Sequence, residues 1–260
     1  MEKSIVIKIG GAAFGKRDPI LEDIVALQKK GKSLVVIHGG GNIVTEWLKK
    51  LGIETKFVRG ERITDRPALD VVAAVLAGLA NKQIVATINN LGGRAVGISG
   101  VDGAMVQSRI ANPELGYVAQ TVKVDPTVIN VLLQAGFIPV ISPITDFTFD
   151  RPSDAPLMLN INGDPMAGEI AAALDAEKLI FLTDVTGVLD KDGKLLAVIN
   201  LKQAKELIDS GTASGGMIPK LNACLIAAAH KTITCIVDGR QPHALINAIE
   251  SDQAGTIIRA

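Results

Sequence analysis

Residues 34 to 41 read Leu34-Val35-Val36-Ile37-His38-Gly39-Gly40-Gly41, an apolar run and one histidine that lead into three glycines. A short apolar run of this kind favours a strand that is covered on both faces, as in a parallel sheet. Apolar residues then recur with helical spacing at Ile43, Trp47, Leu48 and Leu51. We therefore predict a strand, a glycine turn and a helix.

The glycine turn is a predicted anion site. Glycine lets backbone N–H groups approach a ligand closely, and the N-terminus of the following helix adds a positive dipole end. A plain tight turn between a strand and a helix would need only one glycine. Three in a row favour a binding site, with the plain turn as the alternative.

The alternation of strands and helices continues along the chain. Further strands are predicted at 5–9, 95–98, 137–141, 159–161, 178–182, 232–237 and 255–259, and helices at 20–30, from 65 to about 79, and at 125–136, 165–174, 201–210, 221–228 and 241–250. This pattern predicts an α/β fold with an open, mainly parallel sheet sandwiched by helices. The polar segment 146–156 is the best candidate for a lobe boundary or a lid.

Composition narrows the possible functions. Lysine plus arginine equals aspartate plus glutamate at 27 residues each, which argues against a surface that wraps nucleic acid. No uninterrupted apolar run reaches the roughly 18 residues of a membrane span, and the N-terminal residues do not resemble a signal peptide. Cys224 and Cys235 show no metal-ligand spacing. We expect a cytoplasmic protein with two buried thiols and no membrane or nucleic-acid partner.

Five polar residues have no evident role in packing: Lys8, Arg62, Asn160, Asp164 and Lys220. Lys8 interrupts an apolar strand. It is either a strand-end lysine that reaches water or a cation at the sheet edge where α/β proteins bind ligands. The glycine turn at 39–41 is expected on the same edge, which favours the second interpretation.

His38, His230 and His243 are isolated in the sequence, and no Ser-His-Asp or Cys-His arrangement of the kind used for nucleophilic catalysis is visible. Phosphoryl transfer suits such a chain, since it needs positioning and cations around the moving group rather than a covalent nucleophile. Two common nucleotide-binding motifs are incomplete in this sequence. Arg17 stands where the G-x-x-x-x-G-K motif needs Ser or Thr, and 39–44 lacks the third glycine of a dinucleotide fingerprint.

Six motifs occur in a specific order: Lys8-Ile-Gly-Gly11, His38-Gly-Gly-Gly41, Gly60-x-Arg62-x-Thr64, Asn160-Ile-Asn-Gly-Asp164, Thr183-Asp-Val-Thr-Gly-Val-Leu189 and Gly215-Gly-Met-Ile-Pro-Lys220. Each motif is weak alone. Together, over essentially the whole chain, they resemble the amino-acid kinase family, and within it the members that act on N-acetyl-L-glutamate. The resemblance implies transfer of the γ-phosphate of ATP to the side-chain carboxylate of N-acetyl-L-glutamate, an early step of arginine synthesis.

The resemblance also implies roles for residues of this sequence. Lys8 and Lys220 would stabilise the transition state, and Asp164 would order the two lysines. The acceptor would be held at its reacting carboxylate by Gly40 and Gly41, and at its amino-acid end by Arg62 and Asn160.

The expected nucleotide is ATP with Mg²⁺, the metal being held mainly by phosphates, so no protein ligand of the metal is predicted. The nucleotide-binding residues implied by the resemblance are Gly10, Gly11, Asp184, Val185, Thr186, Gly187, Val188, Leu189, Thr212 and Met217. Residues 1–176 would form an N-terminal lobe for the acceptor and for dimerisation, and residues 177–260 a C-terminal lobe for ATP.

Two departures from the family pattern bear on the substrate. Arg59-Gly60-Glu61-Arg62 stands where the family commonly has Asn-Gly-x-Arg, and Gly163 replaces a common alanine. The extra cation would suit an aminoadipate-type acceptor of lysine synthesis, which is the second hypothesis. A non-catalytic amino-acid or nucleotide sensor on the same fold is the third. Because the chain begins just before its first strand, we expect a homodimer with little inhibition by arginine, without the N-terminal helix that builds hexamers in this family.

Overall fold

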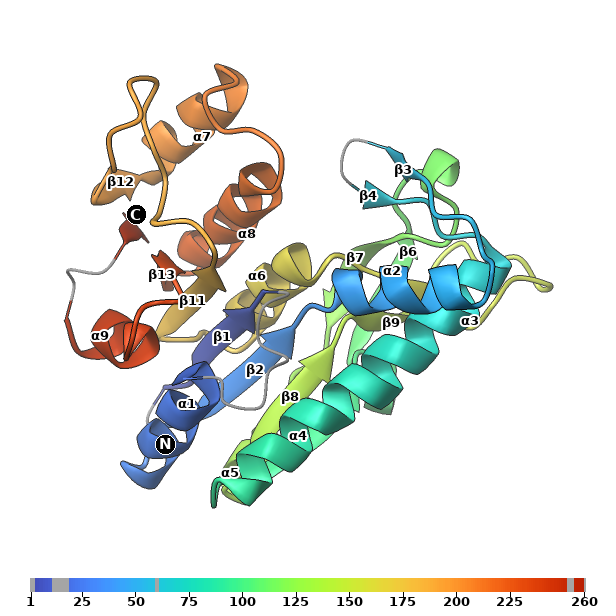
Figure 1. Cartoon of the computed structure of the whole chain (residues 1–260), viewed down its shortest axis with the longest axis horizontal. Helices are drawn as coiled ribbons and strands as arrows, with labels where there is room; N and C mark the ends of the chain where they lie inside the picture. The colour runs from blue at the N-terminus through green and yellow to red at the C-terminus, as the bar shows by residue number, and fades with distance from the viewer. Residues whose placement is uncertain (1–2, 11–18, 59–60, 252–254, 260) are drawn as a thin grey trace.

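The computed structural model describes residues 3–10, 19–58, 61–251 and 255–259. Its centre is an eight-stranded sheet (Figure 1). In spatial order the strands are β12 (Val198–Asn200), β14 (Thr256–Arg259), β13 (Ile233–Asp238), β11 (Lys178–Thr183), β1 (Ile5–Ile9), β2 (Leu34–His38), β8 (Ile138–Ser142) and β5 (Ala95–Ser99). The pairing is parallel except between β13 and β14. The predicted open, mainly parallel sheet is therefore confirmed.

Helices cover both faces of this sheet, as the alternation predicted. One apolar cluster includes Ile5, Ile7 and Ile9 of β1, and it is covered by α1 (Pro19–Lys29), α4 (Asn81–Asn90) and α9 (Ala244–Glu250). The other includes Val6, and it is covered by α5 (Thr127–Gln134), α6 (Gly163–Ala173), α7 (Leu201–Asp209) and α8 (Met217–Ala229). Because side chains alternate along a strand, Lys8 lies on the same face as Val6.

A second, smaller sheet has four strands in the order β10 (Met158–Asn160), β9 (Ile144–Phe147), β6 (Val106–Ile110) and β7 (Ala119–Val124). The polar stretch 146–156 begins in the last two residues of β9 and continues into the connection to β10, so it belongs to a hairpin of this sheet. Two short strands, β3 (Phe57–Val58) and β4 (Glu61–Arg62), form a separate hairpin. It lies near α2 (Gly41–Lys50), which follows the glycine turn (Figure 1).

One long helix runs from Arg66 to Asn90 and contains α3 (Arg66–Ala73), a π-helical stretch η1 (Ala74–Ala80) and α4. Among the described residues it is the one helix that is long and apolar enough to cross a membrane, by length and composition alone. Its buried residues pack inside the protein, with Val72 against α2 and Ile84 against the main sheet. Packing within the protein therefore accounts for the buried apolar residues of this helix.

Several predicted boundaries need correction. The helix after Asp65 does not end near Leu79 but continues to Asn90, and Leu79 is 37% exposed because the π-helical stretch changes which residues face the core. The helix predicted from Pro165 begins at Gly163, so Asp164 belongs to the first helical turn rather than to a loop. Two short 3₁₀ helices, Asp102–Ala104 and Pro113–Leu115, complete the regular structure of the described residues.

Candidate active site

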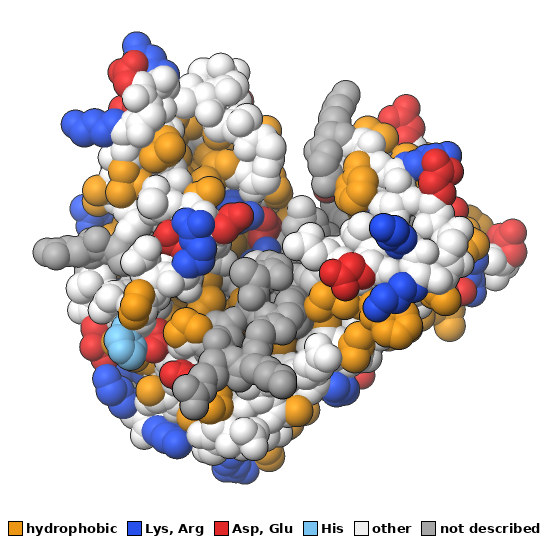
Figure 2. All heavy atoms as spheres, viewed as in Figure 1, with side chains coloured by type: hydrophobic (Ala, Val, Ile, Leu, Met, Phe, Trp, Pro, Cys, Tyr) orange, Lys and Arg blue, Asp and Glu red, His pale blue; other side chains and the backbone are white. Residues whose placement is uncertain are grey.

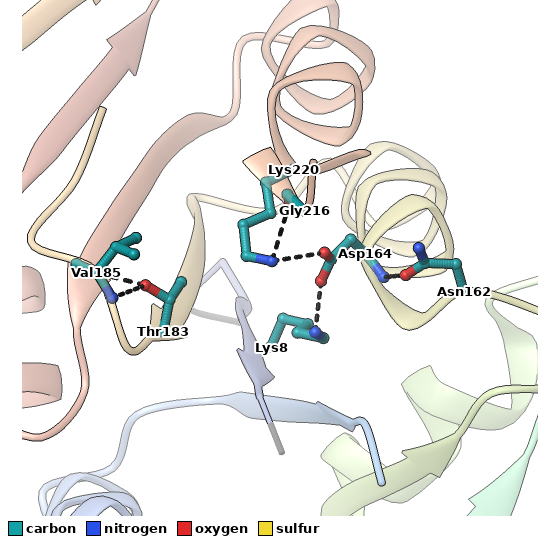
Figure 3. A network of polar contacts seen from close by, with 7 residues as sticks. All are labelled: Lys8, Asn162, Asp164, Thr183, Val185, Gly216 and Lys220. Atoms are coloured by element: carbon teal, nitrogen blue, oxygen red, sulfur yellow. Dashed lines mark hydrogen bonds and ion pairs between the residues drawn. The ribbon is translucent and has the colours of Figure 1, made fainter. Parts of the chain in front are cut away.

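Asp164 holds two lysines from different elements. Lys8 Nζ of β1 lies 2.5 Å from Asp164 Oδ1, and Lys220 Nζ of α8 lies 2.9 Å from Asp164 Oδ2. Figure 3 shows both ammonium groups next to this carboxylate, each at one of its two oxygens. The lysine side chains are 10% and 18% exposed and the aspartate side chain 4%. Because Lys8 is buried and ion-paired, it is not a strand-end lysine that reaches bulk water.

Local sequence explains how these three groups meet. Asn162 caps α6 by accepting a hydrogen bond from the Asp164 backbone N–H at 3.0 Å, which fixes the start of the helix beside the end of β1. Further along α6, an added Cβ at Gly168 would lie 2.7 Å from the Ala223 carbonyl oxygen of α8. The missing side chain therefore lets α6 and α8 pack closely, and this packing brings Lys220 to Asp164.

The electrostatics of this group suit an anion. Burial by itself raises the pKa of Asp164, but the ammonium groups of Lys8 and Lys220 outweigh it and hold that pKa below its ordinary value. The carboxylate is therefore ionised at neutral pH. Two cations and one anion leave one net positive charge in a poorly solvated place, and this charge attracts phosphate oxygens.

Arg62, at the end of β4, forms a second group of polar contacts. Its Nη2 donates to Thr45 Oγ1 at 2.7 Å and to the Gly41 carbonyl oxygen at 3.1 Å. Thr64 links it to Asn160, because Thr64 Oγ1 donates to the Arg62 carbonyl oxygen and accepts from Asn160 Nδ2 at 3.2 Å. Burial lowers the pKa of Arg62, which remains charged at neutral pH.

Arg62 Nη1 is buried and has no hydrogen-bond partner among the described residues. The guanidinium also stacks on the Phe57 ring, with 4.8 Å from Cζ to the ring centroid. A buried unpaired donor costs free energy. A charged fork with one free branch is suited to a carboxylate ligand, which would supply the missing acceptor.

The glycine turn lies between the two groups of contacts. Gly39 N–H donates to the Ile9 carbonyl oxygen at 3.0 Å, so the turn shares its edge of the sheet with the end of β1, as predicted. Gly40 has φ 146° and ψ 18°, a conformation that requires glycine. At the start of α2, a Cβ added to Gly41 would meet no atom of the described residues within 4 Å.

The predicted nucleotide residues lie mostly beyond β11, on the other side of the lysines. Thr183 Oγ1 accepts from the Val185 N–H at 3.0 Å, and Val185 and Leu189 are 41% and 43% exposed. Val188 is buried, and its N–H donates to Thr256 Oγ1 at 2.8 Å. Gly187, the residue before it, is also buried and packs against the same Thr256. The segment from Asp184 to Leu189 thus offers exposed residues on both sides of a buried pair.

The remaining predicted residues are placed as follows. Gly10 N–H donates to the Leu182 carbonyl oxygen at 3.2 Å at the end of β1, Thr212 lies near Ser210 with 3.0 Å between their hydroxyl oxygens, and Met217 begins α8. Gly11 and Arg59 lie outside the described residues. In the space-filling view a hollow separates the part that carries α7 and α8 from the part that carries α2 and the β3–β4 hairpin (Figure 2).

Thr186 also lines a cavity of about 320 Å³ on the far side of its loop, with Asp238 of β13 and Ala244 of α9. Lys8, Asp164 and Lys220 do not line this cavity. The sequence reasoning did not anticipate this cavity, and it did not anticipate Thr45 or Thr64 as partners of Arg62 and Asn160. Thr45 gave a weak signal only, as a threonine one turn after the glycines.

A mainly parallel α/β sheet whose edge brings two lysines onto one carboxylate, beside a half-satisfied arginine, defines a phosphotransferase. The chain belongs to the amino-acid kinase family, whose family model matches residues 3–238. The matched residues include every predicted site residue, from Lys8 to Lys220.

Known proteins similar to this chain agree with that assignment. A protein of Dehalococcoides mccartyi named acetylglutamate kinase is 50% identical over 98% of this chain and 93% of its own length. One of Cereibacter sphaeroides with the same name is 44% identical over 98% of this chain and 87% of its own. The structure of Giardia carbamate kinase matches with a TM-score of 0.72 at 18% identity, over 99% of this chain and 98% of that one, and so supports the fold alone.

Proposed function

We propose that this protein transfers the γ-phosphoryl group of ATP to the side-chain carboxylate of N-acetyl-L-glutamate, giving N-acetyl-L-glutamyl 5-phosphate, in arginine biosynthesis. The observation that carries the transfer is the buried contact of Lys8 and Lys220 with Asp164. The choice of acceptor is supported by the 44–50% identity to proteins named acetylglutamate kinase. The aminoadipate-type kinase and the non-catalytic sensor are not favoured by these similarities.

The geometry supports a division of labour around the phosphoryl group. Lys8 and Lys220 would contact its oxygens and stabilise the charge that develops on them, while Asp164 keeps the two ammonium groups in place. The N–H groups of Gly40 and Gly41 would face the acceptor carboxylate. Arg62 Nη1, which lacks an acceptor, would bind the α-carboxylate of the acceptor together with Asn160.

Magnesium enters this proposal as part of the nucleotide substrate. Asp164 is engaged by two ammonium groups, and among the described residues no group of three or more His, Cys, Asp or Glu side chains is placed to hold a metal. The residues therefore do not fit a protein-held metal site. The phosphates of ATP supply ligands of the kind that Mg²⁺ prefers.

The division into lobes remains a proposal as well. Residues 1–176 contain Arg62, Asn160 and the glycine turn, which supports an acceptor role, and residues 177–260 contain the exposed segment after β11, which supports a nucleotide role.

A homodimer formed through residues 1–176 and a cytoplasmic location complete the proposal. Light scattering at micromolar concentration would give twice the mass of one chain for the homodimer, and a monomer or hexamer would exclude it.

The test of the acceptor is ADP release from Mg-ATP with three compounds side by side: N-acetylglutamate, glutamate and N-acetyl-aminoadipate. We expect turnover with N-acetylglutamate alone, since the chain resembles enzymes of that name. Turnover only with the aminoadipate derivative would replace the acceptor assignment. Tight ATP binding without turnover on any of the three would point to the sensor instead.

The variant Arg62→Ala tests in the same assay whether Arg62 binds the acceptor. It removes the guanidinium with the free Nη1, so the KM for N-acetylglutamate should rise by roughly 10- to 100-fold, in line with about 1.5–3 kcal/mol for a hydrogen bond to a charged group. The KM for ATP should change little. Arg66→Ala, four residues on and at the exposed start of α3, is the matched control. An effect of Arg62→Ala confined to ATP would contradict the assignment.

A further inference from the structure

His38 is a fully buried side chain at the end of β2, and the proposed mechanism gives it no role. Its Nδ1 lies 2.7 Å from the carbonyl oxygen of Gly39, the next residue. Its Nε2 lies 3.2 Å from Nδ2 of Asn81, which is also fully buried and begins α4. A polar pair this deep in the core is costly unless each atom is matched with a partner of the right kind.

The contacts of Asn81 fix which way its amide points. Lys82 Nζ has only protons to give, and it lies 3.1 Å from Asn81 Oδ1. On the other side, the Val140 carbonyl oxygen can only accept, and it lies 2.9 Å from Asn81 Nδ2. Both neighbours require the oxygen towards Lys82 and the nitrogen towards Val140 and His38. The amide orientation therefore follows from hydrogen-bonding chemistry.

This orientation determines the tautomer of His38. Asn81 Nδ2 has two protons and three neighbouring acceptors: the Val140 carbonyl oxygen at 2.9 Å, His38 Nε2 at 3.2 Å and, farthest, the Ile98 carbonyl oxygen at 3.4 Å. Since the Gly39 carbonyl oxygen can only accept a hydrogen bond from Nδ1, Nε2 is the unprotonated nitrogen of the neutral ring and accepts from Asn81. The proton then sits on Nδ1, which donates it to the Gly39 carbonyl oxygen. Burial is the main reason why the pKa of His38 falls to about 4, with the positive charge of Lys8 acting in the same direction against the raising effect of the Gly39 hydrogen bond. The imidazole is thus neutral at neutral pH.

The contact with Gly39 acts on the next residue through the planar peptide. In a trans peptide the carbonyl of Gly39 and the N–H of Gly40 point in opposite directions. Holding the carbonyl against the buried imidazole therefore turns the Gly40 N–H away from the core. Gly40 has φ 146°, so its backbone has rotational freedom that other residues lack, and a fixed carbonyl removes part of it.

The surrounding chain is shaped around this contact. The π-helical stretch η1 ends at Ala80, directly before Asn81, and such stretches are frequent at functional sites. On β5, a Cβ at Gly97 would overlap Asn81 Oδ1 and crowd Lys82 Nζ, so glycine is needed there. Lys82 Nζ also donates to the Gly97 carbonyl oxygen at 2.9 Å. Polar contacts thus run from the exposed Lys82 through Asn81 and His38 to Gly39, and they link the surface to the glycine turn.

We propose that His38 is a positioning residue for phosphoryl transfer: held as its Nδ1–H tautomer by Asn81, it fixes the Gly39 carbonyl and so aims the Gly40 N–H at the reacting carboxylate. The proposal rests on the proposed function for the identity of that carboxylate. The tautomer and the orientation of the turn do not depend on it.

The first test reads the tautomer in the unmodified protein. The chain has three histidines, so ¹³C and ¹⁵N NMR of histidine-labelled protein resolves each ring, and the variant His38→Asn assigns the signal of His38. We expect the proton on Nδ1 and a neutral ring throughout the range from pH 6 to 8. A proton on Nε2, or an imidazolium in this range, would overturn the proposal whatever reaction the protein catalyses.

The second test compares two substitutions. In His38→Asn the side-chain amide nitrogen can take the place of Nδ1 and donate to Gly39, whereas His38→Leu fills the space without a donor. We expect kcat to fall about 10- to 100-fold in His38→Leu, since misplacement by about 1 Å can cost that much, and at most about threefold in His38→Asn. The KM for ATP should stay within twofold in both. His230→Leu, at an exposed histidine, is the control.

The outcomes separate a positioning role from a purely structural one. Thermal unfolding of both variants reports stability, and a merely structural histidine would give losses of kcat that follow the loss of stability. Equal kcat in the asparagine and leucine variants would overturn the proposal. If the unmodified protein shows no turnover with N-acetylglutamate, the proposed function fails. The NMR measurement still tests the tautomer of His38, because it does not depend on the identity of the substrate.

Discussion

Replacing Asp164 with asparagine is expected to lower kcat by roughly 10²–10³, the size of one lost transition-state stabilising group. The substitution keeps the shape of the side chain but removes its charge. Lys8 and Lys220 would then repel each other across a neutral amide, in a place where their side chains are 10% and 18% exposed. Their ammonium groups would no longer be held where the γ-phosphoryl group needs them. Steady-state ADP release measures the effect, and turnover near that of the unmodified protein would remove Asp164 from the mechanism.

The same variant should unfold more easily. Removing one partner of a buried ion pair costs about 3–5 kcal/mol, because the charges left behind are poorly solvated. Urea unfolding should therefore show a lower midpoint at pH 7 with an unchanged slope. Adding Mg-ATP should recover much of this loss, since the phosphates would neutralise both lysines. Asp192→Asn, at the exposed turn after β11, is the matched control and should leave the midpoint unchanged.

Acid should reduce the difference in unfolding free energy between the unmodified protein and Asp164→Asn. The pKa of Asp164 is lowered in the folded state, so its carboxylate stabilises the fold above the unfolded pKa of about 3.9 and loses that contribution as the pH falls through the folded value. At neutral pH the unmodified protein should be the more stable one. Below about pH 4 the two free energies of unfolding should converge. A difference that stays constant down to pH 2 would mean that the Asp164 charge does not stabilise the fold.

The sequence itself predicts much of this arrangement. In β1, Ile5, Ile7 and Ile9 lie on one face and Val6 and Lys8 on the other, as the alternation of a strand requires. The apolar run before the glycine turn predicts the adjacent buried strand. These features depend on residues that are adjacent in the sequence, so the sequence alone predicts them.

Contacts between distant elements could not be predicted in this way. Lys220 meets Asp164 because Gly168 lets α6 and α8 pack closely, and no spacing along the chain indicates that two helices will touch. Likewise, the π-helical stretch before Asn81 shifts the register of a long helix, and nothing in its sequence of small apolar residues marks the shift. The contact of His38, at the end of β2, with Asn81, at the start of α4, is likewise visible only in the folded chain.

Replacing either lysine with alanine should also lower kcat by roughly 10²–10³ while the fold stays intact. In each single variant Asp164 keeps one ammonium partner, at 2.9 Å in Lys8→Ala and at 2.5 Å in Lys220→Ala, so no buried carboxylate is left unpaired. Stability should therefore fall less than in the asparagine variant of Asp164. Lys205→Ala, at an exposed position of α7, serves as the control for loss of a lysine.

The double variant distinguishes two modes of action. If the lysines act as one unit on the phosphoryl group, kcat of Lys8→Ala with Lys220→Ala should fall by much less than the product of the single effects. The physical reason is that one lost cation already misplaces the phosphoryl group, so the other then has little left to stabilise. Fully multiplicative losses would instead assign the lysines to independent tasks, such as binding the nucleotide and stabilising the transferred group. Turnover at the unmodified rate in either single variant would exclude that lysine from catalysis, because its ammonium group would then contribute nothing to the transition state.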